Sequence, residues 1–273
     1  MSLAVSTPAR GGSGASQSSR LVLPGPDPVP VQTYRPAPAD GPPVGFLVWA
    51  HGGSWRHGSA AEWHHATATL AERSGWTVIS VDYRLAPRHR HPRAVHDVLT
   101  ALSWTAGQAS GKPLAVGGDS AGGTLAACAA LVARERGLPL TAQVLAYPPL
   151  DPTCSSPSYH RSPQAFPQAA LLRQARRAWR GDGEPATYDE DGTRVYSTPW
   201  EAPSLAGLAP AVLAVGAHDP VRDDVDAYAR RLRRDGVPVR LLHPPGAVHG
   251  DVLRQDSPVL DHIARAISRK DLP

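Results

Sequence analysis

The segment GDSAGG at residues 118–123 places a serine between small residues, directly after the apolar run 114–116 and before the helix-like stretch 121–136. A sharp strand-to-helix turn strains the backbone at its central residue, and flanking glycines keep side chains from colliding across it. A hydroxyl exposed on such a turn is suited to nucleophilic attack. Ser120 is therefore the candidate nucleophile, and a plain glycine-rich connection is the alternative.

A second glycine-rich segment, HGGSW at residues 51–55, follows the apolar run 45–50. Developing negative charge on a reacting oxygen needs backbone N–H donors, and consecutive glycines leave those amides unobstructed. We predict an oxyanion hole formed by the amides of Gly52 and Gly53, with Ala121 at the positive end of its helix as a third donor. In isolation the same pentapeptide also fits an ordinary turn after a strand.

A carboxylate and an imidazole follow further along the chain. Asp219 comes after the apolar strand 211–215, and the carboxyl ends of strands are where α/β folds place their sites. The acids that follow it fall at the start of the next helix, where a favourable interaction with the helix dipole explains them: Asp223, Asp224 and Asp226. Asp219 is therefore the candidate acid.

The chain has 12 histidines, so position decides which of them is a candidate base. His249 lies beyond the last predicted strand and completes the order Ser, Asp, His. His243 still belongs to a strand end and is followed by two prolines. Asp82 also ends a strand, but that strand precedes the nucleophile, so we expect Asp82 to anchor loop amides.

Residues beside these motifs are predicted to line the substrate pocket: Ser54, Trp55 and Asp119. Trp55 is equally suited to packing its loop onto the core. Neither the histidine pair 64–65 nor the pair 89 and 91 provides the converging ligands of a zinc site. We therefore expect no metal and no cofactor.

The elements that must position these residues alternate between short apolar runs and longer helical stretches, which indicates a mainly parallel sheet. The predicted strands are 21–23, 29–34, 45–50, 77–82, 113–117, 141–147, 211–215 and 239–242. The predicted helices are 60–73, 91–106, 121–136, 221–234 and 258–268.

Residues 151–209 break this alternation, and we interpret them as a lid inserted into a single domain that spans 21–273. Residues 1–20 are predicted to be a flexible tail. A helical piece of the lid at 169–180 carries arginines at helical spacing: Arg173, Arg176, Arg177 and Arg180. They form either a solvated face or a patch that steers an acidic substrate or a carrier protein toward the pocket.

Composition narrows the class of protein. Hydrophobic residues make up 41% and charged residues 19% of the 273 residues, as in soluble globular domains. The net charge of +4 comes without any nucleic-acid-binding motif, so we expect no nucleic acid partner. The only cysteines, Cys128 and Cys154, are too few for a disulfide framework, which fits the cytoplasm. No apolar run is long enough for a signal peptide or membrane span.

In combination the motifs resemble the hormone-sensitive-lipase-like group of bacterial carboxylesterases, which includes acetyl esterases, over roughly residues 45–250. HGGSW is similar to its HGGG-type oxyanion loop and GDSAGG to its nucleophile elbow. Residues 81–87 resemble its DYRLAP segment, and residues 219–223 resemble its D-P-L-x-D acid loop. The resemblance implies an α/β-hydrolase fold, with a mainly parallel central sheet flanked by helices and a lid before the acid-bearing strand.

The resemblance also implies a serine-dependent esterase that works through an acyl-enzyme, with Ser120, His249 and Asp219 as its triad. Because the lid is small, we expect short-chain acyl esters as substrates, and a homodimer is a compatible assembly. The same site would also serve amide or formamide hydrolysis, acyl transfer, or a lyase or cyclase step. A ligand-binding protein that has lost the chemistry is the alternative from another class.

Three residues depart from the family pattern. Ser54 stands in place of the third glycine of the oxyanion loop, Arg88 in place of the usual glutamate after LAP, and Asp251 in place of an apolar residue after His-Gly. These departures bear on substrate preference more than on the triad. The chain before the first strand lacks the N-terminal cap helices of many relatives, so residues 151–209 would form most of the acyl pocket's cover.

Overall fold

The computed structural model describes residues 17–25, 27–37, 41–161 and 163–268. Within them, eight strands form one sheet in the order β1-β2-β4-β3-β5-β6-β9-β10. Their bounds are β1 Gln17–Leu23, β2 Val29–Arg35, β3 Phe46–Ala50, β4 Thr77–Val81, β5 Leu114–Asp119, β6 Ala142–Ala146, β9 Ala211–Ala214 and β10 Val239–Leu242. β1 and β2 pair antiparallel with each other, and β2 pairs antiparallel with β4. The remaining neighbours are all parallel.

The prediction of a flexible tail over residues 1–20 is wrong for residues 17–20, which belong to the strand β1. Residues 17–20 pair with β2 from Gln17 opposite Arg35 to Arg20 opposite Gln32, so they are part of the sheet. They are mostly exposed at the sheet's edge, and an edge strand needs no alternating apolar pattern. That is why the polar letters QSSR gave no strand signal. Residues 1–16 of the predicted tail lie outside the described residues.

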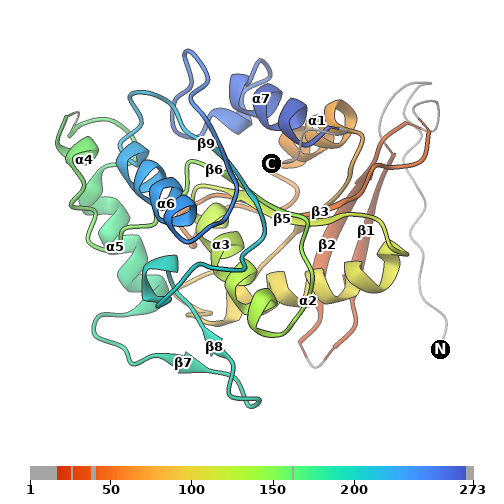
Figure 1. Ribbon diagram of the computed structural model, residues 1–273, viewed down its shortest axis with the longest axis horizontal. Coiled ribbons are helices and arrows are strands. Elements are labelled where there is room, and N and C mark those ends of the chain that lie inside the picture. Colours follow the sequence, from red (N-terminus) through yellow and green to blue (C-terminus); the bar gives the residue numbers. More distant parts are fainter. Residues whose placement is uncertain (1–16, 26, 38–40, 162, 269–273) are drawn as a thin grey trace.

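The helices that flank the sheet are α1 His64–Ser74, α2 Arg93–Ala109, α3 Ala121–Glu135, α6 Arg222–Arg234 and α7 Pro258–Ile267. α1 packs with α7 on one face, and α2 packs with α3 on the other (Figure 1). α6 lies against β9 and β10. This layered, mainly parallel sheet confirms the predicted fold class. Within the described ranges, none of the helices has the length and apolar character needed to span a bilayer.

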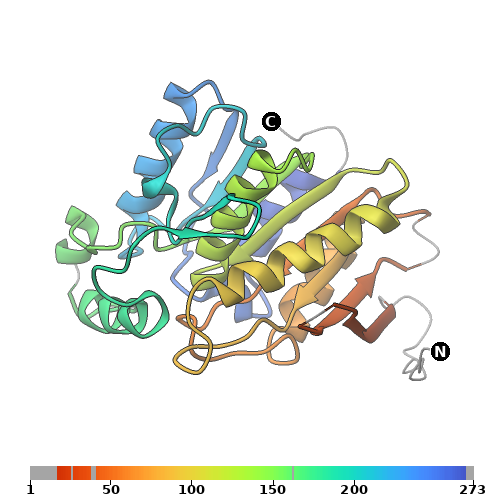
Figure 2. The same cartoon turned by 90° about the horizontal axis from the view of Figure 1, so that it is seen from below.

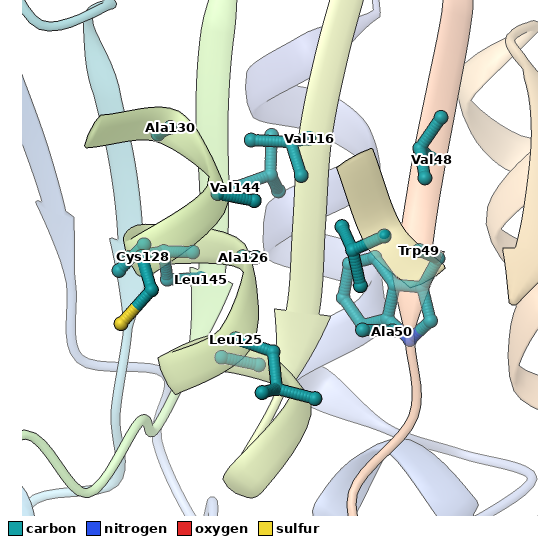
Figure 3. Close-up of a cluster of buried hydrophobic side chains, with 14 of the residues drawn as sticks. Val48, Trp49, Ala50, Val116, Leu125, Ala126, Cys128, Ala130, Val144 and Leu145 are labelled. Atoms are coloured by element: carbon teal, nitrogen blue, oxygen red, sulfur yellow. The ribbon is translucent and has the colours of Figure 1, made fainter. Parts of the chain in front are cut away.

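The centre of the core is the contact between α3 and the strands β5 and β6, drawn in Figure 3. α3 presents small residues, among them Ala126, Cys128 and Ala130, and its first thirteen residues are all buried. Small side chains let the helix axis approach the sheet closely. Burial raises the pKa of the Cys128 thiol, which packs here as a small hydrophobic group. The helix is thus held firmly at its N-terminus, where Ser120 lies.

The chain between β6 and β9 leaves the sheet, as the sequence predicts for residues 151–209. It forms α4 Pro157–Arg161, α5 Ala169–Arg180, the hairpin β7 Thr187–Tyr188 with β8 Arg194–Val195, and the short helix η2 Pro199–Glu201. The predicted helix at 169–180 coincides with α5. In both views α4 and α5 lie at the α6 end of the molecule, away from β1 and β2 (Figure 2). We call residues 151–209 the cap.

Candidate active site

Ser120 lies on the tight turn between β5 and α3, with φ 49° and ψ −121°. The turn requires glycine neighbours: a Cβ on Gly122 would lie 2.0 Å from the carbonyl oxygen of Ala50, and a Cβ on Gly118 2.5 Å from that of Gly122. The Ser120 amide donates to the carbonyl of Ala146 at 2.9 Å. A strained residue held from both sides in this way presents its side chain in one direction.

The three predicted triad residues meet in one chain of hydrogen bonds. His249 Nε2 lies 2.8 Å from Ser120 Oγ, and His249 Nδ1 lies 3.0 Å and 3.1 Å from the two carboxylate oxygens of Asp219. Asp219 follows β9 and is held by the amide of Val221, which donates to its Oδ1 at 3.0 Å. Because an ionised carboxylate only accepts hydrogen bonds, this pairing puts a proton on Nδ1 and leaves Nε2 free to accept one from the serine.

The structure changes the predicted oxyanion hole. The N–H of buried Gly52 donates to Asp119 Oδ1 at 3.1 Å, so the prediction that Gly52 is a free donor is wrong. Gly53 and Ser54 are partly exposed, and their amides and that of Ala121 donate to no acceptor within the described part of the chain. Gly53 and Ala121 therefore stay candidate donors, and the Ser54 amide joins them as a candidate in place of Gly52.

Asp119 is an internal anchor and not the pocket-lining residue that we predicted. Its Oδ1 accepts hydrogen bonds from the indole nitrogens of Trp63 at 2.9 Å and Trp49 at 3.3 Å, in addition to the amide of Gly52. Burial raises the pKa of this carboxyl group to about 7. Because Asp119 directly precedes Ser120, its carboxylate ties the loop 51–55 to the turn that carries the serine, a link that no local sequence pattern reveals.

Further contacts hold the same loop. The Tyr83 hydroxyl donates to the carbonyl of His51 at 2.9 Å, and the two rings stack with centroids 4.2 Å apart. Burial lowers the pKa of His51 to about 4, so its ring is neutral at physiological pH. Gly53 has φ 106°, and a Cβ there would lie 2.0 Å from the carbonyl oxygen of His57. Asp82 accepts from the Ala60 amide at 3.1 Å, which confirms the prediction that it anchors loop amides.

This arrangement can be compared with known proteins. A family model described as the alpha/beta hydrolase fold matches residues 47–253. The chain belongs to the α/β-hydrolase family.

Its relatives place this α/β hydrolase in the hormone-sensitive-lipase-like carboxylesterase group, as the motif resemblance implied. It is 37% identical to the carboxylic ester hydrolase LipN of Mycobacterium tuberculosis over 84% of its own length, and it spans 63% of LipN. It is 35% identical to an ethyl acetate hydrolase of Pseudomonas putida, covering 84% of this chain and 73% of that one. The crystal structure of an esterase from the archaeon Pyrobaculum calidifontis superposes with a TM-score of 0.82 at 33% identity, covering 94% of this chain and 86% of that one.

In this α/β hydrolase the aromatic residue of HGGSW faces the cap. Trp55 is 1% exposed, and its ring stacks on Trp179 of α5 with centroids 4.9 Å apart and an interplanar angle of 4°. Of the two alternatives for Trp55, packing of the loop is the one observed, although its partner belongs to the cap. Ser54, beside it, has φ 55° and is partly exposed.

Two aromatic rings that the sequence did not single out lie against the imidazole of His249. The Tyr147 ring is 4.7 Å from it, and the Tyr147 hydroxyl accepts from the Val252 amide at 3.0 Å. Phe166, from the cap, meets the imidazole edge-on at 5.5 Å and is itself 66% exposed. Phe166 is one of two phenylalanines in the chain, but nothing in its neighbourhood in the sequence signals this position.

The departures from the family pattern have different structural consequences. Asp251 is buried and accepts hydrogen bonds from the Ser257 hydroxyl at 2.7 Å and the Val259 amide at 3.1 Å, so it fixes the start of α7. Arg88 is exposed on the surface.

No group of three histidine, cysteine, aspartate or glutamate side chains suited to a metal ion occurs among the described residues.

Proposed function

We propose that this chain is a serine-dependent carboxylesterase, with Ser120 as nucleophile, His249 as general base and Asp219 as the acid that orients it. The observation that carries the proposal is the unbroken chain of hydrogen bonds from Ser120 Oγ through His249 to Asp219. Relatives named as ester hydrolases support the same activity.

In the first half-reaction the Ser120 oxygen attacks the ester carbonyl while its proton passes to His249 Nε2. The negative charge on the carbonyl oxygen is held by the amides of Gly53, Ser54 and Ala121. The imidazolium returns its proton to the departing alcohol, which leaves an acyl group on Ser120. A water molecule then gives one proton to the same imidazole while its oxygen attacks the acyl carbon. The imidazolium returns that proton to Ser120 Oγ as the bond from Ser120 to the acyl carbon breaks, which releases the acid and restores the serine.

We further propose that the cap covers the acyl pocket and restricts it to short chains. Phe166 supports this, because its ring already lies against His249. The relative named as an ethyl acetate hydrolase is consistent with small acyl groups.

The test is labelling with a fluorophosphonate, followed by hydrolysis of p-nitrophenyl esters of increasing chain length. Wild type should be labelled and should prefer short acyl chains, and Ser120→Ala should lose both labelling and turnover. Labelling that survives this substitution would remove Ser120 from its role. Labelling without ester turnover would favour acyl transfer or another substrate, and a preference for long chains would contradict the proposed cap.

A further inference from the structure

A cleft of about 650 Å³ lies in the cap, between α5 and the segment that contains η2. Its walls include Arg173, Arg176 and Arg180 from one side of α5, and Ser197 and Trp200 from the opposite segment. Neither Ser120 nor His249 lines it. The cleft is therefore distinct from the candidate active site.

Arg176 is the unusual residue of this cleft, because it is only 7% exposed and forms no ion pair with a described carboxylate. Its Nη2 donates to the carbonyl of Ser197 at 3.0 Å, while its Nη1 has no acceptor among the described residues. The guanidinium lies 5.9 Å from the Trp55 ring and 5.8 Å from the Trp179 ring. Burial lowers the pKa of Arg176 even though the charge of Glu201 opposes this shift, so the buried guanidinium is incompletely compensated and a bound anion would stabilise its charged form.

Two further arginines in the cleft also lack a described carboxylate partner. Arg173 reaches only the carbonyl of Thr153, at 3.5 Å, and Arg180 donates to the carbonyls of Glu184 and Pro185. Their spacing along α5 places Arg173, Arg176 and Arg180 on neighbouring turns of one helix side.

The carboxylates of the cleft do not balance these arginines. Asp182 pairs with Arg177 at 3.1 Å, and Glu201 pairs with Arg194 at 3.4 Å. Glu184 is the third carboxylate in the wall. An excess of positive charge therefore remains in a concave site, which is unlike a solvated helix face.

We propose that this cleft binds a small oxyanion, a phosphate or carboxylate group, held by Arg173, Arg176 and Arg180. Guanidinium groups match the planar, multidentate acceptors of these anions. The anion is either a free ligand or the charged end of an ester substrate. In both cases it would reinforce the contact between α5 and Trp55, the last residue of the HGGSW segment.

Calorimetric titration of the full chain with inorganic phosphate tests the site directly. We expect wild type to bind with a Kd below about 1 mM. Arg176→Gln and Arg173→Gln should each weaken binding on the order of tenfold, the loss typical of one charge-assisted contact. Arg265 is an exposed residue of α7 outside the cleft, so Arg265→Gln makes the same change in net charge and should leave Kd unaltered. Arg173 is only half-buried, so its variant keeps the test valid if Arg176→Gln fails to fold.

Absence of phosphate binding in wild type would overturn the proposal, as would an equal loss in Arg265→Gln, which would indicate nonspecific charge attraction. Capture of an acidic carrier protein without phosphate binding would also overturn it, in favour of a protein-binding surface. The titration measures binding and needs no turnover. It therefore tests the anion site even if the chain proves to have no esterase activity.

A kinetic comparison separates the two sources of the anion and rests on the proposed function. If the anion belongs to the substrate, Arg173→Gln should raise KM for p-nitrophenyl hemisuccinate several-fold more than KM for p-nitrophenyl propionate. If the anion is a free ligand, the ratio of the two KM values should not change while the phosphate Kd does. Both results support an oxyanion site.

Discussion

At the scale of single residues, the candidate site depends on one imidazole held between a serine and a carboxylate. Asp219 accepts from His249 Nδ1 through both oxygens and is itself held by a backbone amide. The carboxylate therefore fixes which imidazole nitrogen faces the serine, and stabilises the imidazolium that forms.

The substitution Asp219→Asn tests this role. An amide in place of the carboxylate can donate to Nδ1 and so favour the wrong tautomer, and we expect kcat for p-nitrophenyl acetate to fall by about 10³–10⁴. The melting temperature should change little by comparison. Asp223→Asn is the matched control, because Asp223 accepts from the Ser158 amide and from Arg161 in the cap and does not touch His249. A similar loss of kcat in both variants would contradict the assignment.

The triad residues were predictable because each follows a recognisable strand, and because the α/β-hydrolase topology requires the serine, the aspartate and the histidine to occur in that order along the chain. The oxyanion donors were predictable only in part. The Gly52 amide is taken by Asp119, a residue 67 positions away, and only the folded sheet brings β3 and β5 together. Phe166 and Trp179 were not predictable as neighbours of the site, since an irregular insertion carries no periodicity that fixes where its side chains point.

At the scale of elements, the cap is joined to the sheet through Asp224 at the start of α6. Its carboxylate accepts from the amides of Leu150 and Asp151, and from the hydroxyls of Ser156 and Tyr159. The sequence suggested only a favourable helix-dipole interaction for this residue. The structure shows in addition that one buried side chain connects α6, the loop that follows β6, and α4.

Removing this connection should destabilise the fold. Asp224→Ala leaves several buried donors without an acceptor, and we expect the free energy of unfolding to fall by about 1–3 kcal/mol in urea titrations. Asp226→Ala, two residues along the same helix, loses partly exposed pairs with Arg222 and His243 and should cost less than about 1 kcal/mol. An equal cost for both would mean that Asp224 acts only through the helix dipole.

The edge-on contact of Phe166 with His249 gives a second prediction at this scale. Phe166→Ala should leave the melting temperature almost unchanged, because the side chain is largely exposed, but should lower kcat/KM for p-nitrophenyl butyrate on the order of tenfold. Leu171→Ala removes another exposed apolar side chain from the cap and should affect neither quantity. Equal kinetic losses in both variants would indicate a general effect of the cap.

At the scale of the whole molecule, buried aspartates and buried histidines have opposite effects on the free energy of unfolding as the pH falls. Burial raises the pKa of Asp119 to about 7 and of Asp224 to about 6, so the folded state takes up these protons before the unfolded state does. Acidification from pH 7 toward 4 therefore stabilises the fold through these acids. Burial lowers the pKa of His51 to about 4 and of His91 to about 3, and protonation of both in the unfolded state opposes this effect.

The variant Asp119→Asn should reveal this balance. Asparagine cannot titrate, so the variant loses a stabilising contribution that grows as the pH falls through about 7, while the destabilising histidine contributions remain. The free energy of unfolding, measured in urea at several pH values between about 7 and 4.5, should fall more steeply on acidification than in wild type. His91→Gln should show the opposite change, with a shallower fall, since it removes a group that protonates only on unfolding. Parallel pH profiles for wild type and Asp119→Asn would mean that Asp119 is already ionised in the folded protein, with its three N–H donors outweighing the effect of burial.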